Sequence, residues 1–191
     1  MKKQEYDKKI ILYALIPGLG QFKNGQKEKG AIFLTIFGLF CLESAFFGIN
    51  ALQELITLGS EPGIDNSMFL MVRGTLQLLI TLIFVGFYVS QIRDAIKVNK
   101  NKTIGLPIAT GFTGIKGSLA THGFPYLLTF PAYILMIFTI VLPVLVTLFM
   151  AFTNYDFNHI PPAALIDWIG IQNFKDMFFL SSYRSTFMAV F

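Results

Sequence analysis

Two charged side chains lie inside long apolar stretches of the sequence. Glu43 interrupts the apolar run 31–49, and Arg73 interrupts the run 68–92. A charged group in hydrocarbon is costly unless it is paired or lines a polar pathway. Each residue lies about six residues, or about 9 Å of helix, from the end of its run that leads into residues 50–67. We therefore predict an ion pair between Glu43 and Arg73, and the alternative is that either residue lines a polar pathway.

The sequence contains no arrangement of residues that is typical of catalysis. No GxxxxGK[ST] phosphate-binding loop is present, and the glycines after Pro17 form only a PGLG break with no expected strand before it. The single cysteine, Cys41, lies in an apolar run, and no Cys/His cluster has metal-ligand spacing. His122 and His159 fall on opposite sides of a membrane in the topology derived below. We predict no catalytic, cofactor-binding or metal-binding residues, no cofactor and no enzymatic activity.

The longest apolar run, from Pro125 to Tyr155, has no charged side chain between Tyr126 and Phe152. A hydrocarbon core of about 30 Å requires roughly 20 apolar residues in a helix. The run does not alternate between polar and apolar residues as a barrel strand would. Pro131 and Pro143 could each loosen the helix, because proline lacks the N–H group and crowds the preceding turn. We predict a membrane helix over 125–153.

The composition extends this prediction to the whole chain. Of the 191 residues 54% are hydrophobic and only 14% are charged, whereas a soluble domain has about 25% charged residues. The net charge of +4 does not indicate nucleic-acid binding, because the basic residues form short clusters between apolar runs, as in proteins whose charges set membrane orientation. The sequence predicts an all-α membrane protein embedded in a lipid bilayer.

Three transmembrane helices are predicted, preceded by a short re-entrant or interfacial helix. The short helix falls in Ile10 to Phe22, which is too short to span the bilayer and is broken by Pro17-Gly18. Its flanking lysines and the lack of a small-x-small cleavage site argue against a cleaved signal peptide. The predicted division is a cytoplasmic N-terminal region 1–30, a transmembrane hairpin 31–92 with spans at 31–49 and 68–92, a cytoplasmic loop 93–124, the third span 125–153, and an extracytoplasmic segment 154–191.

The distribution of basic residues predicts the orientation of the chain. Residues 1–30 contain seven of the 15 Lys and Arg residues, and residues 93–124 contain five. Residues 50–67 contain none, and residues 154–191 contain two. Because cytoplasmic loops are enriched in Lys and Arg, the N-terminus is predicted inside and the C-terminal segment outside.

The segment after the third span is polar and rich in turn-forming residues. Tyr155 and Trp168 suit the membrane interface, where an amphipathic ring is stable. Asn173 is predicted to cap a short helix through Leu180. The apolar stretch 187–191 begins like another membrane entry and stops, so we expect a fragment that leads to a missing fourth helix.

A resemblance to a known family rests on the last third of the sequence. The residues FPYLLTFPAYILMIFTIVLPVLVTLFMAFTNYDF, followed by NHIPPAALID and WIGIQNFKDMF, resemble the permease subunits of sugar ABC importers. The match is most similar to the maltose/maltodextrin permease of the larger, MalF-like kind. The element PGLGQFKNGQKEKG near the start also resembles the N-terminal region of such permeases.

This resemblance implies a function and a set of partners. It implies a transmembrane subunit of an ATP-driven sugar importer in the bacterial plasma membrane. The implied partners are a second permease subunit, ATP-binding subunits that dock on a loop missing here, and an extracytoplasmic solute-binding protein. The large outer domain of some members is absent, so the implied contact with the binding protein falls on a small surface that includes Tyr155, Asp156, Trp168 and Asn173. The alternative is a non-transporting membrane scaffold or interaction protein that is complete at 191 residues.

Overall fold

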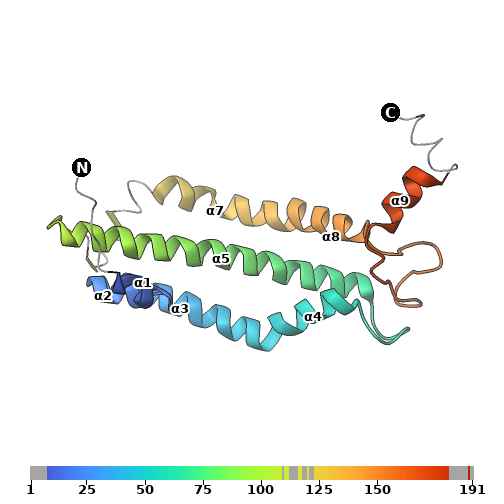
Figure 1. The fold of residues 1–191 in the computed structure, drawn as a ribbon, viewed down its shortest axis with the longest axis horizontal. Helices are drawn as coiled ribbons and strands as arrows, with labels where there is room; N and C mark the ends of the chain where they lie inside the picture. Colours follow the sequence, from blue (N-terminus) through green and yellow to red (C-terminus); the bar gives the residue numbers. More distant parts are fainter. Residues whose placement is uncertain are drawn as a thin grey trace. The chain divides into compact units, whose positions relative to one another are not determined.

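The computed structural model describes residues 8–108, 110–111, 116–117, 120, 123–180 and 189. Within this part the chain is helical, with one isolated β-bridge and no strand (Figure 1). It forms two compact units, one of residues 1–46 and 80–133 and the other of residues 47–79 and 134–191. The sequence inferences on His122 and on Ser181 to Phe187 lie outside the described residues.

The first candidate span is longer than the sequence predicted. It consists of α3 (Lys27–Glu43), a π-helical turn (Ser44–Gly48) and α4 (Ile49–Thr57). Together these form 31 continuous helical residues. The helix ends at Thr57, and it is followed by Leu58 with a left-handed φ of 55° and by Gly59 with a φ of 104°. The extension past Ile49 brings Glu54 into the helix.

The second candidate span is α5 (Ser67–Thr103), a helix of 37 residues. The side chain of Asn66 begins it by accepting hydrogen bonds from the backbone N–H groups of Met68 and Phe69. At 1.5 Å per residue the helix is about 55 Å long, which exceeds a hydrocarbon core of about 30 Å. The predicted span 68–92 is therefore part of a longer helix whose last turns carry Lys100 and Lys102.

The third candidate span, Leu128–Met150, begins inside α7 (Phe124–Met136) and continues through a second π-helical turn (Ile137–Val141) and α8 (Leu142–Met150). Pro131 lies inside α7, and Pro143 is near the start of α8, directly after the π-helical turn. The regular hydrogen-bonding pattern therefore changes next to Pro143, in line with the expected loosening.

Few residues in the most apolar parts of these three helices are buried. In the most apolar stretch of each helix only 6%, 22% and 6% of the residues are buried. Exposed apolar helices of this length are suited to lipid. The prediction of an all-α membrane protein with three membrane-crossing helices is confirmed, and the orientation of the chain stays a prediction.

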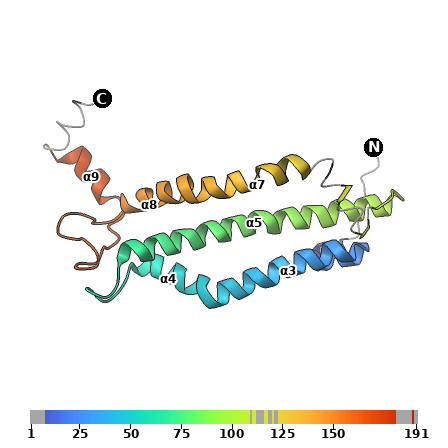
Figure 2. The same cartoon turned by 180° about the vertical axis from the view of Figure 1, so that it is seen from behind.

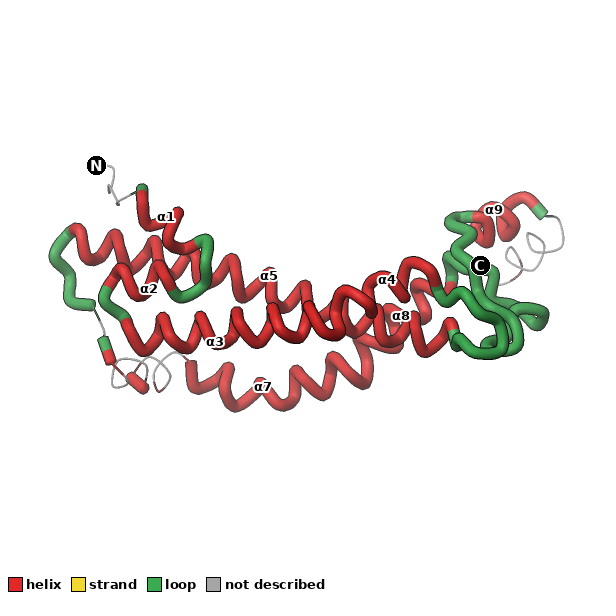
Figure 3. The backbone as a smooth tube through the Cα atoms, turned by 90° about the horizontal axis from the view of Figure 1, so that it is seen from below, coloured by secondary structure: helices red, strands yellow, loops and turns green. Residues whose placement is uncertain are grey.

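In the first unit, two short helices pack against the long ones. The helices α1 (Lys9–Ala14) and α2 (Leu19–Asn24), with the turn between them, form a structure that we call the N-terminal hairpin. Figure 3 shows both beside α3 and the C-terminal half of α5. Further along, the rings of Phe33, Phe37 and Phe40 on α3 pack against Phe84 and Phe87 on α5, and the Phe40 and Phe84 rings stack at 3.7 Å.

In the second unit, an apolar cluster joins α4, α5 and α8 to the chain that follows α8. Its buried members are Leu55, Leu58, Met71, Val146 and Ile166. After α8 the chain forms a loop that leads into α9 (Gln172–Phe179), as Figure 2 shows. The burial of Ile166 fixes this loop to the helices.

Candidate functional site

Within the segment 151–180, residues 153–154 pair with residues 167–168 and close a loop. Thr153 and Trp168 form an antiparallel β-bridge. Asn154 donates its backbone N–H to the carbonyl of Asp167 at 3.1 Å, and its side-chain oxygen accepts the Asp167 N–H at 2.7 Å. The residues between these two positions therefore form a loop with a fixed base.

Trp168 joins this loop to the end of α4. Its indole Nε1–H donates to the carbonyl of Leu55 at 3.1 Å, and its ring meets the edge of Phe149 at a centroid distance of 6.1 Å. The last four carbonyls of a helix have no partner within the helix. Trp168 therefore caps the C-terminus of α4 with a side-chain donor.

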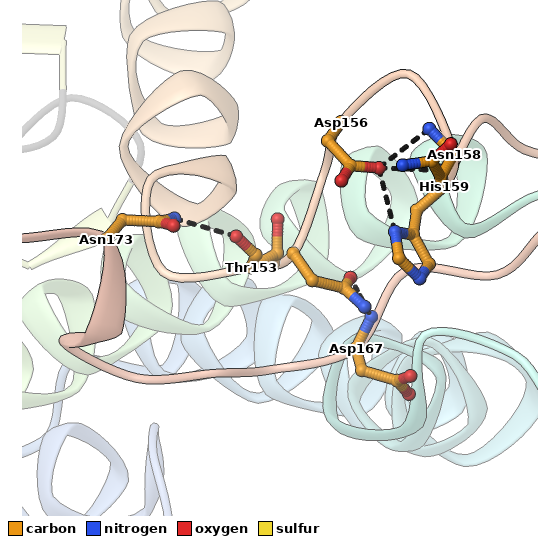
Figure 4. Close-up of polar contacts among 7 residues, drawn as sticks. Thr153, Asp156, Asn158, His159, Asp167 and Asn173 are labelled. Atoms are coloured by element: carbon orange, nitrogen blue, oxygen red, sulfur yellow. Dashed lines mark hydrogen bonds and ion pairs between the residues drawn. The ribbon is translucent and has the colours of Figure 1, made fainter. Parts of the chain in front are cut away.

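Asn173 has a role other than the predicted one. It lies inside α9, which begins at Gln172 and has no side-chain cap, so the predicted helix cap is wrong. Its amide instead donates to the carbonyls of Ala151 and Thr153 at 3.0 and 2.8 Å (Figure 4). This side chain fixes the start of α9 to the chain that leaves α8.

Asp156 organises the exposed part of the loop. Its Oδ1 accepts hydrogen bonds from the backbone N–H groups of Asn158 and His159 and lies 2.8 Å from the His159 Nδ1 (Figure 4). The hydrogen bond from His159, with those of the two backbone groups, lowers the pKa of the Asp156 carboxyl from its ordinary value. Tyr155 is 45% exposed and Phe157 is 97% exposed.

The four predicted surface residues thus divide into two kinds. Trp168 and Asn173 brace the segment through backbone carbonyls. Tyr155 and Asp156 are exposed and available to another molecule. Their assignment as a contact surface stays a prediction.

Arg73 has a carboxylate partner that the sequence analysis missed. Its Nη1 lies 3.1 Å from Glu54 Oε1, and the side chains are 49% and 27% exposed. Glu43 belongs to the first unit, where the Ser44 hydroxyl lies 3.5 Å from its Oε2. The predicted pairing of Glu43 with Arg73 stays a prediction. The sequence does not predict this partner, because the apolar run ends at Ile49 and Glu54 lies beyond it.

The N-terminal hairpin is held to α5 by buried amide side chains, which the sequence analysis did not single out. Gln91 donates to the carbonyl of Ala14 at 2.7 Å, and Gln21 donates to the carbonyl of Gln91 at 3.0 Å. Asn24 donates to the carbonyl of Ala95 at 2.8 Å and accepts from Asn99 at 3.0 Å.

Glycines allow the hairpin to approach its neighbours closely. Gly18 has a φ of 96°, and a Cβ there would collide with the carbonyl oxygen of Gly30. A Cβ on Gly20 would lie 2.9 Å from the Cβ of Ala95. The PGLGQFKNGQ element is therefore a packing and hydrogen-bonding unit.

The structure shows one open hollow near the hairpin, with a volume of about 280 Å³. None of the predicted site residues lines it, and its polar lining includes Gln26, Asp94, Lys97 and Asn101. Among the described residues no group of three or more His, Cys, Asp or Glu side chains could hold a metal ion.

The three apolar helices define a multi-pass α-helical membrane protein. The chain is 53% identical over 183 residues to the maltodextrin transport system permease protein MdxF of Bacillus subtilis, covering 96% of this chain and 42% of MdxF. It is 44% identical over 190 residues to the maltodextrin transport system permease protein MalC of Streptococcus pneumoniae, covering 100% of this chain and 43% of MalC. It is 37% identical over 186 residues to the galactooligosaccharides transport system permease protein GanP of Bacillus subtilis, covering 94% of this chain and 43% of GanP.

Over nearly its whole length the chain is similar to these permease proteins of sugar transport systems. It spans about two fifths of the length of the curated relatives it matches. No protein-family profile matches the chain, and no solved structure matches it.

Proposed function

We propose that this chain is the N-terminal part of the permease subunit of an ATP-driven maltodextrin importer and forms part of the translocation pathway. The observation that carries the proposal is the 53% identity to a maltodextrin permease over 96% of the chain. Identity to the galactooligosaccharide permease is lower, at 37%. Three exposed apolar helices support a role inside the membrane.

The proposed partners follow from this assignment. They are a second permease subunit, ATP-hydrolysing subunits on the cytoplasmic side and a solute-binding protein on the outer side. The concentration of basic residues in 1–30 and 93–124 supports an N-terminus inside and a C-terminal segment outside. In this orientation the exposed Tyr155 and Asp156 face the binding protein.

Transport by the full-length protein, assembled with its partners in proteoliposomes, tests the function. We expect uptake of labelled maltodextrin that requires ATP and the binding protein and that is competed more strongly by unlabelled maltodextrin than by galactooligosaccharide. Deletion of residues 1–191 should abolish uptake. An assembled complex that hydrolyses ATP but takes up no maltodextrin would indicate another solute. An assembly without ATP-coupled uptake of any oligosaccharide would favour the scaffold alternative.

Single cysteines test the orientation and the contact surface together. In a Cys41→Ser background, Tyr155→Cys should react with a membrane-impermeant thiol reagent in intact cells and should crosslink to the binding protein. Lys102→Cys, at the other end of the membrane helices in the proposed topology, is the matched control and should react only after permeabilisation. Crosslinks from Lys102→Cys but not from Tyr155→Cys would overturn the assignment.

A further inference from the structure

The face of the N-terminal hairpin that points away from α5 is apolar. Leu12 is 69% exposed, Leu15 is 53% exposed and Ile16 is 46% exposed. On the opposite face Ile10 and Ala14 are buried in a cluster with Ala95 of α5. A group of exposed leucine and isoleucine side chains on so short a structure indicates a surface that contacts lipid or another molecule. The hydrogen bonds to α5 lie on the opposite face and do not bury these side chains.

Lysines gather at one end of the hairpin, and the apolar turn is at the other end. The chain reverses at residues 15–18, so the beginning of α1 and the end of α2 lie at the same end. Four exposed lysines lie at or next to that end: Lys9 and Lys23 on the hairpin, Lys8 directly before it, and Lys27 at the start of α3. The Lys23 ammonium group lies 5.2 Å from the centre of the Tyr13 ring, which links the end of α2 to α1 by a cation–π contact.

Contacts with α5 show how the apolar and basic ends of the hairpin lie along that helix. The apolar turn lies next to Tyr88, whose hydroxyl donates to the Leu15 carbonyl at 2.8 Å. The lysine end lies next to Ala95 and Asn99, the hydrogen-bond partners of Asn24. The apolar part of α5 precedes Tyr88, whereas its basic last turns follow Asn99. The hairpin and α5 therefore change from apolar to basic in the same direction.

We propose that the N-terminal hairpin is a shallow lipid anchor and that the four lysines at its end bind acidic phospholipid headgroups. A helix of six residues is about 9 Å long, which matches the depth of about 5–10 Å that interfacial helices reach. The apolar turn contacts acyl chains, and Lys8, Lys9, Lys23 and Lys27 remain at headgroup level. The described residues of the hairpin contain no acidic side chain. Nearby, Glu28 on α3 is partly buried and Asp94 on α5 is paired with Lys29 at 2.7 Å, so the exposed charge at this end is basic and complements an anionic surface. The α3 helix, against which Gly18 packs, continues this lipid-facing surface. The inference depends on the chain being a membrane protein and not on what it transports.

Spin labels test the depth of the hairpin in the full-length protein, reconstituted without partners in nanodiscs of phosphatidylcholine and phosphatidylglycerol. In a Cys41→Ser background, a label at Leu12→Cys is expected to be accessible to oxygen and protected from a water-soluble nickel chelate, like a label at Leu39→Cys on α3. A label at Thr103→Cys, at the end of α5, gives the aqueous control. A Leu12 label as accessible to nickel as the Thr103 label would overturn the proposal and leave this face for a protein partner.

The relative association constant of phosphatidylglycerol over phosphatidylcholine tests the lysines. Each lysine near an acidic surface contributes on the order of fivefold in affinity. The variant Lys8→Gln/Lys9→Gln/Lys23→Gln is expected to lower the association constant at least tenfold. The matched variant Lys97→Gln/Lys100→Gln/Lys102→Gln removes the same charge from α5 and should lower it less. An unchanged constant in the hairpin variant, or an equal fall in both variants, would show that the hairpin binds no acidic lipid of its own.

Discussion

The N-terminal hairpin and the segment 151–180 are both non-spanning stretches attached to membrane helices, but different forces attach them. The hairpin is held by buried glutamine and asparagine side chains that donate to backbone carbonyls of the hairpin and of α5. The segment 151–180 is held by an apolar cluster around Ile166 and by its own backbone pairing. Buried amides must meet specific acceptors, whereas an apolar cluster tolerates small rearrangements. The hairpin should therefore be the more sensitive of the two to single substitutions.

The largest expected effect concerns Gly18 in the hairpin. Gly18→Ala should destabilise the hairpin by about 3 kcal/mol or more, because it adds a clash with Gly30 to a strained backbone conformation. Gly25→Ala is the matched control, since Gly25 also has a positive φ, of 93°, but has open space around its Cβ position. It should cost about 1–2 kcal/mol. Hydrogen exchange of the α1 and α2 amides measures both, and equal effects would show that close packing does not hold the hairpin.

The second prediction concerns Gln91, whose side chain is 1% exposed. Gln91→Leu should destabilise the protein by about 1–3 kcal/mol, because the Ala14 carbonyl loses its buried donor. Gln53→Leu, at an exposed position of α4, is the control and should change stability by less than about 0.5 kcal/mol. Thermal unfolding in detergent measures the difference. Equal stability of the two variants would contradict the role of buried amides.

A smaller effect is expected at Trp168 in the segment 151–180. Trp168→Phe keeps an aromatic ring next to Phe149 but removes the donor to Leu55, which should cost about 1 kcal/mol. Trp168→Ala also removes the ring contact and should cost about 3 kcal/mol or more. If the two variants unfold at the same temperature, the hydrogen bond carries the attachment and the apolar contact does not.

The ion pair of Arg73 should contribute less still. A double-mutant cycle with Glu54→Gln and Arg73→Gln should give a coupling of about 0.2–1 kcal/mol, because both side chains are partly exposed. A cycle with Glu43→Gln and Arg73→Gln tests the pairing predicted from the sequence. A larger coupling to Glu43 than to Glu54 would favour the sequence prediction over the pair that the structure shows.

The smallest effect is expected from acidification of the Asp156 turn. The pKa of Asp156 is lowered by the hydrogen bonds of the folded loop, so ionised Asp156 favours the loop above the ordinary value of 3.8. This contribution should be lost as the pH falls through the lowered pKa. The Asn158 and His159 amides should lose protection from hydrogen exchange on acidification, after correction for the intrinsic exchange rate, and this loss should be absent in Asp156→Asn. The same acid dependence in Asp156→Asn would exclude this carboxyl as the cause.

The sequence was sufficient to predict where the membrane helices lie, but not the contacts that attach the other segments to them. The runs 31–49 and 68–92 are long and apolar and each lies in a helix long enough to cross a membrane, and the run 125–153 extends three residues past the end of the third such helix at Met150. Helix ends were less predictable, because polar residues such as Glu54 can continue a helix beyond its apolar part. The role of Asn173 was wrong because a capping residue and an internal donor have the same local sequence pattern.

The hairpin contacts could not be predicted, because their partners lie far apart in the sequence. Gln21 and its acceptor Gln91 are separated by 70 residues, and no local pattern links them. The glycines at 18 and 20 were interpreted as a helix break. Their steric role becomes visible only beside Gly30 and Ala95, which the fold brings to them.

The separation of Gln21 from Gln91 also sets an order of events during synthesis. A ribosome adds about 5–20 residues per second, so the 70 residues between them take about 4–14 s to make. During this interval Gln21 and Asn24 have no α5 carbonyls to bind, and their amides require water. The hairpin should therefore stay at a hydrated surface until α5 has left the insertion machinery. Docking of the hairpin follows completion of that helix.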